Sequence, residues 1–135
     1  MSATNHLANG VNLMDALTSP RNIMALVTES WSVRADKVVM RHTDPDDKWI
    51  DVTGEQAREY VDAVAKGLIA RGVGPGDTVG IMCRTRIEWT VLDFAIWSAG
   101  AIPVPVYDTS SASQIDWITS DSNITTLFVL SLIHI

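Results

Sequence analysis

The stretch that decides the fold reads TVGIMCRTRIEWTVLDFAIWSAGAIPVPVYDTSSASQIDWITSDSNITTLFV (residues 78–129). Its apolar residues come in short runs that alternate with helical segments. Thr78 to Met82 shows no polar alternation, as expected for a strand that is covered on both faces. A nearly all-apolar helix is predicted from Ile87 to Ala99, and Gly100 stops it before a strand from Ala101 to Tyr107.

The same unit recurs at the end of this stretch, with a helix predicted from Ser111 to Ser122 and a strand from Thr125 to Val129. Strands that alternate with helices at this spacing imply right-handed crossovers and a parallel sheet with helices on its faces. The sequence therefore predicts an α/β fold, with a partial parallel sheet.

A further helix is predicted directly before the first of these strands. Thr53, with Gln56 three positions later, forms a capping-box start. Apolar residues then recur at helical spacing, at Ala57, Tyr60, Val61, Val64, Ala65, Leu68 and Ile69.

Glycines at 72, 74 and 76 suggest a nucleotide-binding loop, but phosphate-binding loops run from a strand into a helix and this loop runs the other way. A helix end followed by a Pro-Gly turn is favoured.

Two short strands, Lys37 to Arg41 and Lys48 to Val52, are predicted to form a β-hairpin before that helix. Asp44, Asp46 and Asp47 lie in the turn between them. These carboxylates could hold a cation, but no calcium-loop pattern follows them. A solvated hairpin tip is therefore favoured.

The first predicted helix has its apolar residues at Ile23, Met24, Val27 and Trp31, with Ser19 as N-cap and Pro20 at the first helical position. Residues 1–19 show no sustained period and are predicted to form a flexible leader.

Composition favours one acidic, soluble domain. The 135 residues are 47% hydrophobic and include five Trp, which is enough for a core. A net charge of −6, with ten scattered Lys and Arg, argues against nucleic-acid binding.

The absence of a secretory signal favours the cytoplasm. No apolar run approaches the roughly 20 residues that cross a bilayer, although peripheral membrane contact stays open.

Polar residues gather where two of the predicted parallel strands end. Arg84, Arg86 and Glu88 follow the first strand, at the end of the sheet where α/β folds bind ligands. They could contact a phosphate or a partner domain. The plainer alternative is a helix N-terminus, with Glu88 complementing the helix dipole and both arginines in solvent.

Tyr107, Thr109 and Ser110 follow the next strand. Capping of the following helix explains only some of the hydroxyls there, so these three are candidate cleft-lining residues.

Cys83, the one cysteine, could act as a nucleophile only beside a basic group, and the histidines show no spacing that supplies one. It is predicted to be a small core or strand-end residue.

The run from Gly67 to Ser122 resembles the N-terminal region of bacterial, particularly actinobacterial, AMP-forming long-chain acyl-CoA synthetases. The resemblance rests on the GVGPGD turn, the arginine-flanked EW, prolines 103 and 105, and the VYDTSS segment with Trp117 in the helix after it. It covers about Lys37 to Val129. It implies that residues 20–129 form part of the large N-terminal domain of such an enzyme.

The resemblance also implies an activity. Enzymes of this family use ATP and Mg²⁺ to convert a fatty acid to an acyl-adenylate, and then transfer the acyl group to coenzyme A. Their phosphate loop, adenine and ribose motifs and catalytic lysine are expected beyond the last residue. No catalytic residue and no metal ligand are assigned, and the chain alone is expected to be inactive.

Two alternatives stay open. The chain could be a stand-alone, non-catalytic α/β interaction module, or a fragment of another acyl-adenylating enzyme, such as a medium-chain ligase or a carboxylate reductase. The ending LSLIHI (residues 130–135) departs from the family and matches the translation of a common sequencing-library transposon end. We hypothesise that it is a non-native tail, which the nucleotide sequence would test.

Overall fold

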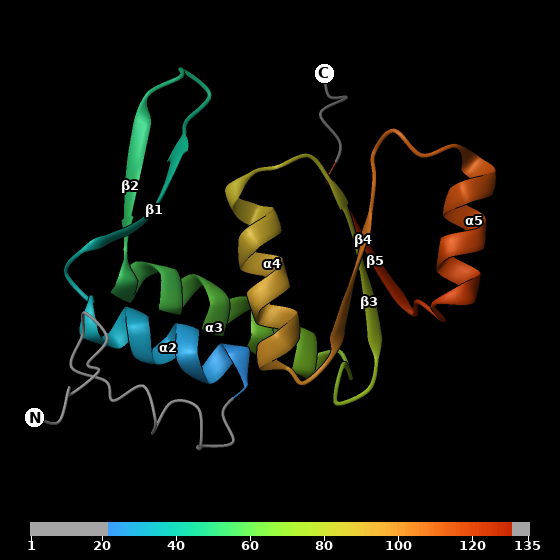
Figure 1. The fold of residues 1–135 in the computed structure, drawn as a ribbon, viewed down its shortest axis with the longest axis horizontal. Helices are drawn as coiled ribbons and strands as arrows, with labels where there is room; N and C mark the ends of the chain where they lie inside the picture. The colour runs from blue at the N-terminus through green and yellow to red at the C-terminus, as the bar shows by residue number, and fades with distance from the viewer. Residues whose placement is uncertain (1–21, 131–135) are drawn as a thin grey trace, which may run out of the picture.

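A β-hairpin and a three-stranded parallel sheet, with helices packed against them, make up the described part of the chain, residues 22–130 of a computed structural model (Figure 1). In chain order the elements are α2 (Ile23–Val33), β1 (Val38–Thr43), β2 (Trp49–Thr53), α3 (Gly54–Ala70), β3 (Thr78–Cys83), α4 (Ile87–Ser98), β4 (Ile102–Val106), α5 (Ala112–Asp121) and β5 (Thr126–Leu130). None of these helices is long and apolar enough to cross a membrane.

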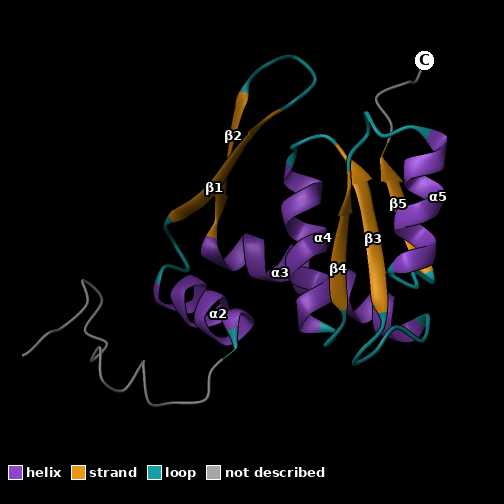
Figure 2. Cartoon of the chain, turned by 45° about the vertical axis from the view of Figure 1, so that its right-hand side comes forward, coloured by secondary structure: helices purple, strands orange, loops and turns teal. Residues whose placement is uncertain are grey.

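The parallel sheet has the order β4-β3-β5, with β3 paired in parallel to both neighbours. Helices cover both of its faces, because α3 and α4 pack on one side and α5 lies on the other (Figure 2). The Thr78 hydroxyl fixes α5 by donating to the carbonyl oxygens of Ser122 and Asn123, both at 2.8 Å. This arrangement confirms the predicted α/β fold.

The core lies between the sheet and the helices α2, α3 and α4. Val79, Ile81 and Cys83 of β3 face this side, and the aromatic ring of Trp31 on α2 meets that of Phe94 on α4 edge to face at 5.3 Å. The largest fully buried side chains are Ile81, Ile96, Val52, Val61 and Val79. The opposite side of the sheet is less covered, since α5 has no buried residue.

Helix α3 begins and ends as predicted. Thr53 and Gln56 form the expected capping box. At the other end Gly72 takes φ +91° and Gly76 φ +89°, conformations that favour glycine, so the loop is a helix end and turn. The apolar residues at helical spacing are expected to face the core, and for two of them this is wrong: Tyr60 is 45% exposed and Ile69 is 54% exposed. The buried stripe runs through the other apolar positions, and these two lie at its flanks.

The start of the first helix also differs from the prediction. Asn22, not Ser19, is the N-cap of α2, because its side-chain oxygen accepts a hydrogen bond from the Ala25 N–H at 2.8 Å. An asparagine side chain satisfies a free N–H group of the first turn as well as serine does. Ser19, Pro20 and the predicted leader lie outside the described residues.

The hairpin of β1 and β2 is antiparallel, as predicted, and forms a sheet of its own. Asp44 shapes its tip, since one carboxylate oxygen accepts from the N–H groups of Asp46 and Lys48, both at 2.8 Å. The carboxylate therefore has a structural partner in the turn, which agrees with the solvated-tip interpretation.

The strand and helix ends differ from the predicted ones by one or two residues. The last strand, β5, includes Leu130, which pairs with Cys83 and is the first residue of the expected tail. Residues 131–135 lie outside the described part of the chain, and the origin of the tail stays a hypothesis.

Candidate functional site

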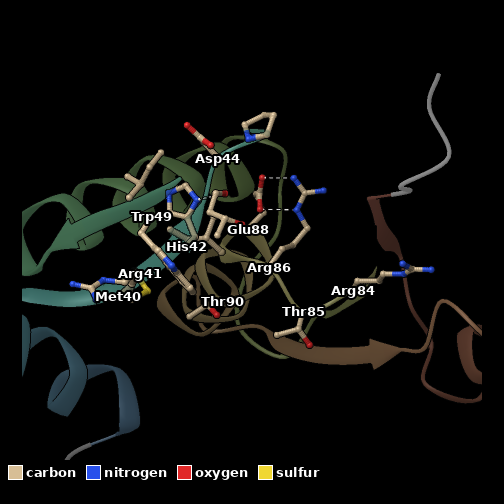
Figure 3. Close-up of a pocket in the computed structure, with 14 residues that line it drawn as sticks. Met40, Arg41, His42, Asp44, Trp49, Arg84, Thr85, Arg86, Glu88 and Thr90 are labelled. Carbon is tan, nitrogen blue, oxygen red and sulfur yellow. Dashed lines mark hydrogen bonds and ion pairs between the residues drawn. The ribbon is translucent and has the colours of Figure 1, made fainter. Parts of the chain in front are cut away.

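A groove lies between the hairpin and the start of α4, and we call it the hairpin groove. It encloses about 1020 Å³ (Figure 3). One wall comes from the hairpin and the other from the β3–α4 loop and the first turns of α4. The lining residues are Met40, Arg41, His42, Thr43, Asp44, Pro45, Trp49, Ile50, Arg84, Thr85, Arg86, Ile87, Glu88 and Thr90.

The second wall lies where the sequence analysis placed a candidate ligand-binding site, at Arg84, Arg86 and Glu88. β3 ends at Cys83 and α4 begins at Ile87, so the loop between them leaves the carboxyl end of a parallel strand and enters a helix. The prediction did not include the hairpin wall. Residues 40–50 precede this loop by about forty positions, and no local pattern shows that the two segments meet.

An ion pair lies where this loop enters α4. The Arg86 guanidinium donates from Nε and Nη2 to the two carboxylate oxygens of Glu88, at 2.7 and 2.6 Å. This hydrogen bonding holds the pKa of the Glu88 carboxyl below its usual value, although partial burial opposes the shift. In Figure 3 the carboxylate lies between Arg86 and His42, and the His42 charge acts weakly in the same direction.

Replacing Glu88 by glutamine tests the ion pair. Because the folded-state pKa is lowered, the carboxylate stabilises the fold above its unfolded pKa of about 4.3, and this contribution is lost as pH falls through the folded pKa. Both side chains are partly exposed, so we expect a loss of about 0.2–1 kcal/mol at pH 7 that disappears in acid. Urea unfolding at several pH values measures it, with Glu59→Gln on α3 as control. A loss that persisted in acid would contradict the ion-pair explanation.

A second ion pair joins the ends of two neighbouring strands. Arg84 follows β3, Asp108 follows β4, and the guanidinium Nε donates to the carboxylate at 3.0 Å. Arg84 and Arg86 are therefore both exposed, as the plainer alternative expected. Each is also paired with a carboxylate, which that alternative did not include. Arg84 points away from Arg86 and Glu88 (Figure 3), so the two ion pairs form separate clusters.

The candidate cleft-lining residues lie on the loop after β4. Tyr107 is 77% exposed, Thr109 is exposed and Ser110 is half-buried. The Ser110 N–H donates to the Tyr107 carbonyl at 3.1 Å, which makes a turn. The next residue, Ser111, caps α5 together with Gln114. None of the three lines the hairpin groove, so their role stays a prediction.

Cys83 ends β3 on the covered face of the sheet and is buried. Burial raises the pKa of its thiol above the ordinary value, and the opposing effect of the Arg86 charge is smaller. A protonated, buried thiol is a poor nucleophile. The prediction of a core or strand-end residue is confirmed.

Comparisons with known proteins give the family. Residues 27–134 match the model of a family described as AMP-binding enzyme. The chain is 44% identical over 107 residues to long-chain-fatty-acid–CoA ligase FadD15 of Mycobacterium tuberculosis, which covers 79% of this chain and 18% of that protein. It is 35% identical over 75 residues to the peroxisomal long chain acyl-CoA synthetase 7 of Arabidopsis thaliana, covering 56% of this chain and 11% of the relative.

Solved structures agree in fold. The anthranilate CoA ligase AuaEII in complex with anthranoyl-AMP superposes with a TM-score of 0.71 at 26% identity, over 81% of this chain and 20% of that one. CmiS6 superposes with a TM-score of 0.73 at 19% identity, over 78% and 27%. The chain thus spans about a fifth of the length of the FadD15 relative, 18%. On its match to the family model and to this relative, the chain belongs to the AMP-binding enzyme family.

Proposed function

We propose that this chain is part of a long-chain fatty acid–CoA ligase of the AMP-forming type, which works in the cytoplasm. The single observation that carries the proposal is the 44% identity to FadD15 over 107 residues. The intact enzyme would activate a fatty acid with ATP and Mg²⁺ to an acyl-adenylate and then form the thioester with coenzyme A. Residues 20–129 would belong to its large N-terminal domain.

The described residues do not fit the ATP and metal sites of that reaction. Between residues 22 and 130, no group of three His, Cys, Asp or Glu side chains could hold a metal ion. The glycine-rich turn follows helix α3 and precedes strand β3, so it offers no helix N-terminus to a triphosphate. We therefore assign no chemical step to this chain, and we expect it to be inactive alone.

What the described residues contribute in this proposal is a scaffold. The parallel strands end side by side, and the ion pair of Arg84 and Asp108 holds the loops after β3 and β4 together. Ligands of open α/β sheets bind outside the carboxyl ends of the strands. Tyr107, Thr109 and Ser110 lie on one of these loops, so we propose that they approach the cleft of the intact enzyme.

A chimera tests the proposal without any assumption about the rest of the gene. The segment of FadD15 that aligns with this chain is replaced by this chain's own residues, and thioester formation is measured with ATP, Mg²⁺, coenzyme A and acids of graded length. We expect the chimera to retain ligase activity and the preference for long-chain acids. FadD15 with the segment deleted is the negative control.

Two results would contradict the proposal. A chimera that folds like its parent, by circular dichroism and thermal unfolding, but forms no thioester with any acid would refute membership of a ligase. A chimera that prefers medium-chain acids would refute the long-chain assignment.

A further inference from the structure

The loops after β3 and β4 are joined by side chains in the register of the strands that precede them. Met82 pairs with Val106 in the last row between the two strands. Arg84 and Asp108 each follow two residues later, and the Arg84 Nε donates to the Asp108 carboxylate at 3.0 Å. The ion pair thus continues the order of the strands beyond their carboxyl ends, where open α/β sheets bind ligands.

The loop from Tyr107 to Ser110 is held at both of its ends. The ion pair fixes its start at Asp108, and the Ser110 N–H closes a turn on the Tyr107 carbonyl at 3.1 Å. Directly after the loop, Ser111 and Gln114 form a capping box, in which the Ser111 N–H donates to the Gln114 Oε1 at 2.8 Å. A binding loop that is already ordered loses less conformational entropy when a ligand arrives.

Two hydroxyl groups on this loop take no part in holding it. Within residues 22–130, neither the Thr109 Oγ1 nor the Ser110 Oγ makes a hydrogen bond with the protein, because capping of α5 uses the hydroxyl of Ser111 instead. Thr109 is exposed and Ser110 is half-buried. The fixed loop therefore offers two unengaged hydroxyls at the carboxyl end of the sheet.

We propose that Arg84 and Asp108 are positioning residues, whose ion pair fixes the loop so that the hydroxyls of Thr109 and Ser110 meet a bound substrate of the intact enzyme. This inference rests on the proposed function. The two side chains are 68% and 36% exposed, so their pairing adds little to stability. Its effect is on geometry, and a misplacement of about 1 Å can reduce the rate of an enzyme about 100-fold.

Amide hydrogen exchange on this chain tests whether the pair holds the loop. In Arg84→Gln we expect the Ser110 N–H to exchange about two- to fivefold faster, as the loss of an exposed ion pair allows, while the N–H groups of β3 do not change. The reversed pair, Arg84→Asp with Asp108→Arg, should restore slow exchange. Lys37→Gln breaks the exposed ion pair with Asp36, before β1, and serves as the control.

The chimera with FadD15 tests the consequence for the substrate. With Arg84→Gln we expect the KM of one of the three substrates, fatty acid, ATP or coenzyme A, to rise about tenfold, as the loss of one or two hydrogen bonds allows. The other two KM values and kcat should match those of the Lys37→Gln chimera. The reversed pair should restore the raised KM. A residue that only stabilises the fold would not change a single KM.

Three results would overturn the proposal. Unchanged exchange of the Ser110 N–H in Arg84→Gln would show that the pair does not hold the loop. Unchanged KM values, or a loss of kcat alone, would show that the position of the loop does not serve binding. A raised KM that the reversed pair fails to restore would mean that Arg84 itself contacts the substrate. A chimera that is inactive before any substitution contradicts the proposed function instead, and the exchange measurement then decides the positioning role.

Discussion

Replacing Trp31 by alanine is expected to lower the free energy of unfolding by about 3–5 kcal/mol. Trp31 is buried, and its ring contacts Phe94, which in turn lies 5.7 Å from the ring of Trp97. Trp31 thus connects α2 to α4 through an aromatic contact. A small domain has a total stability of about 5–15 kcal/mol, so this loss removes a large share of it. Urea unfolding followed by far-ultraviolet circular dichroism measures the change.

Trp117→Ala is the matched control. Trp117 lies on α5 and is 66% exposed, and substitutions at such surface positions change stability by about 0.5 kcal/mol or less. Trp31→Phe keeps an aromatic ring against Phe94 and should lose less than the alanine variant. Equal, small effects of Trp31→Ala and Trp117→Ala would show that α2 does not pack on α4 as described.

Local signals explain why much of the fold was predictable from the sequence. The capping box at Thr53 and Gln56 fixes where α3 begins, and glycines with a positive φ follow α3 and α4, as Gly100 does at φ +78°. Unbroken apolar runs then mark the covered strands. These signals give the number and order of elements, and the alternation of helix and strand gives the parallel sheet.

The contacts that these signals cannot give depend on tertiary packing. Tyr60 and Ile69 fit the helical period of α3, yet they are exposed because its buried stripe is narrower than the apolar pattern. For the site, the strand-end position of Arg84, Arg86 and Glu88 was predictable. Their surroundings were not, because Asp108 is 24 residues from Arg84 and His42 comes from another sheet.

Gly54 is a structural residue that sequence analysis missed. It directly follows the capping Thr53 and begins α3, where its N–H donates to the Lys37 carbonyl at 3.0 Å. A Cβ atom there would lie 2.5 Å from the Trp31 carbonyl oxygen and 2.6 Å from that of Arg34. The start of α3 therefore sits directly on the end of α2. The only hint in the sequence is a glycine at a helix position where other residues are usually better.

Gly54→Ala is accordingly expected to destabilise the fold by about 1–3 kcal/mol or more, because the clash is with backbone atoms that cannot rotate away. Gly67→Ala, in the same helix, is the control with the opposite sign. A Cβ at Gly67 meets nothing within 4 Å, and alanine is better than glycine in a helix interior by about 0.5–1 kcal/mol. Thermal and urea unfolding of both variants measure the two changes. If Gly54→Ala were neutral or stabilising, α3 could not begin against α2, and the hairpin wall of the groove would have to lie elsewhere.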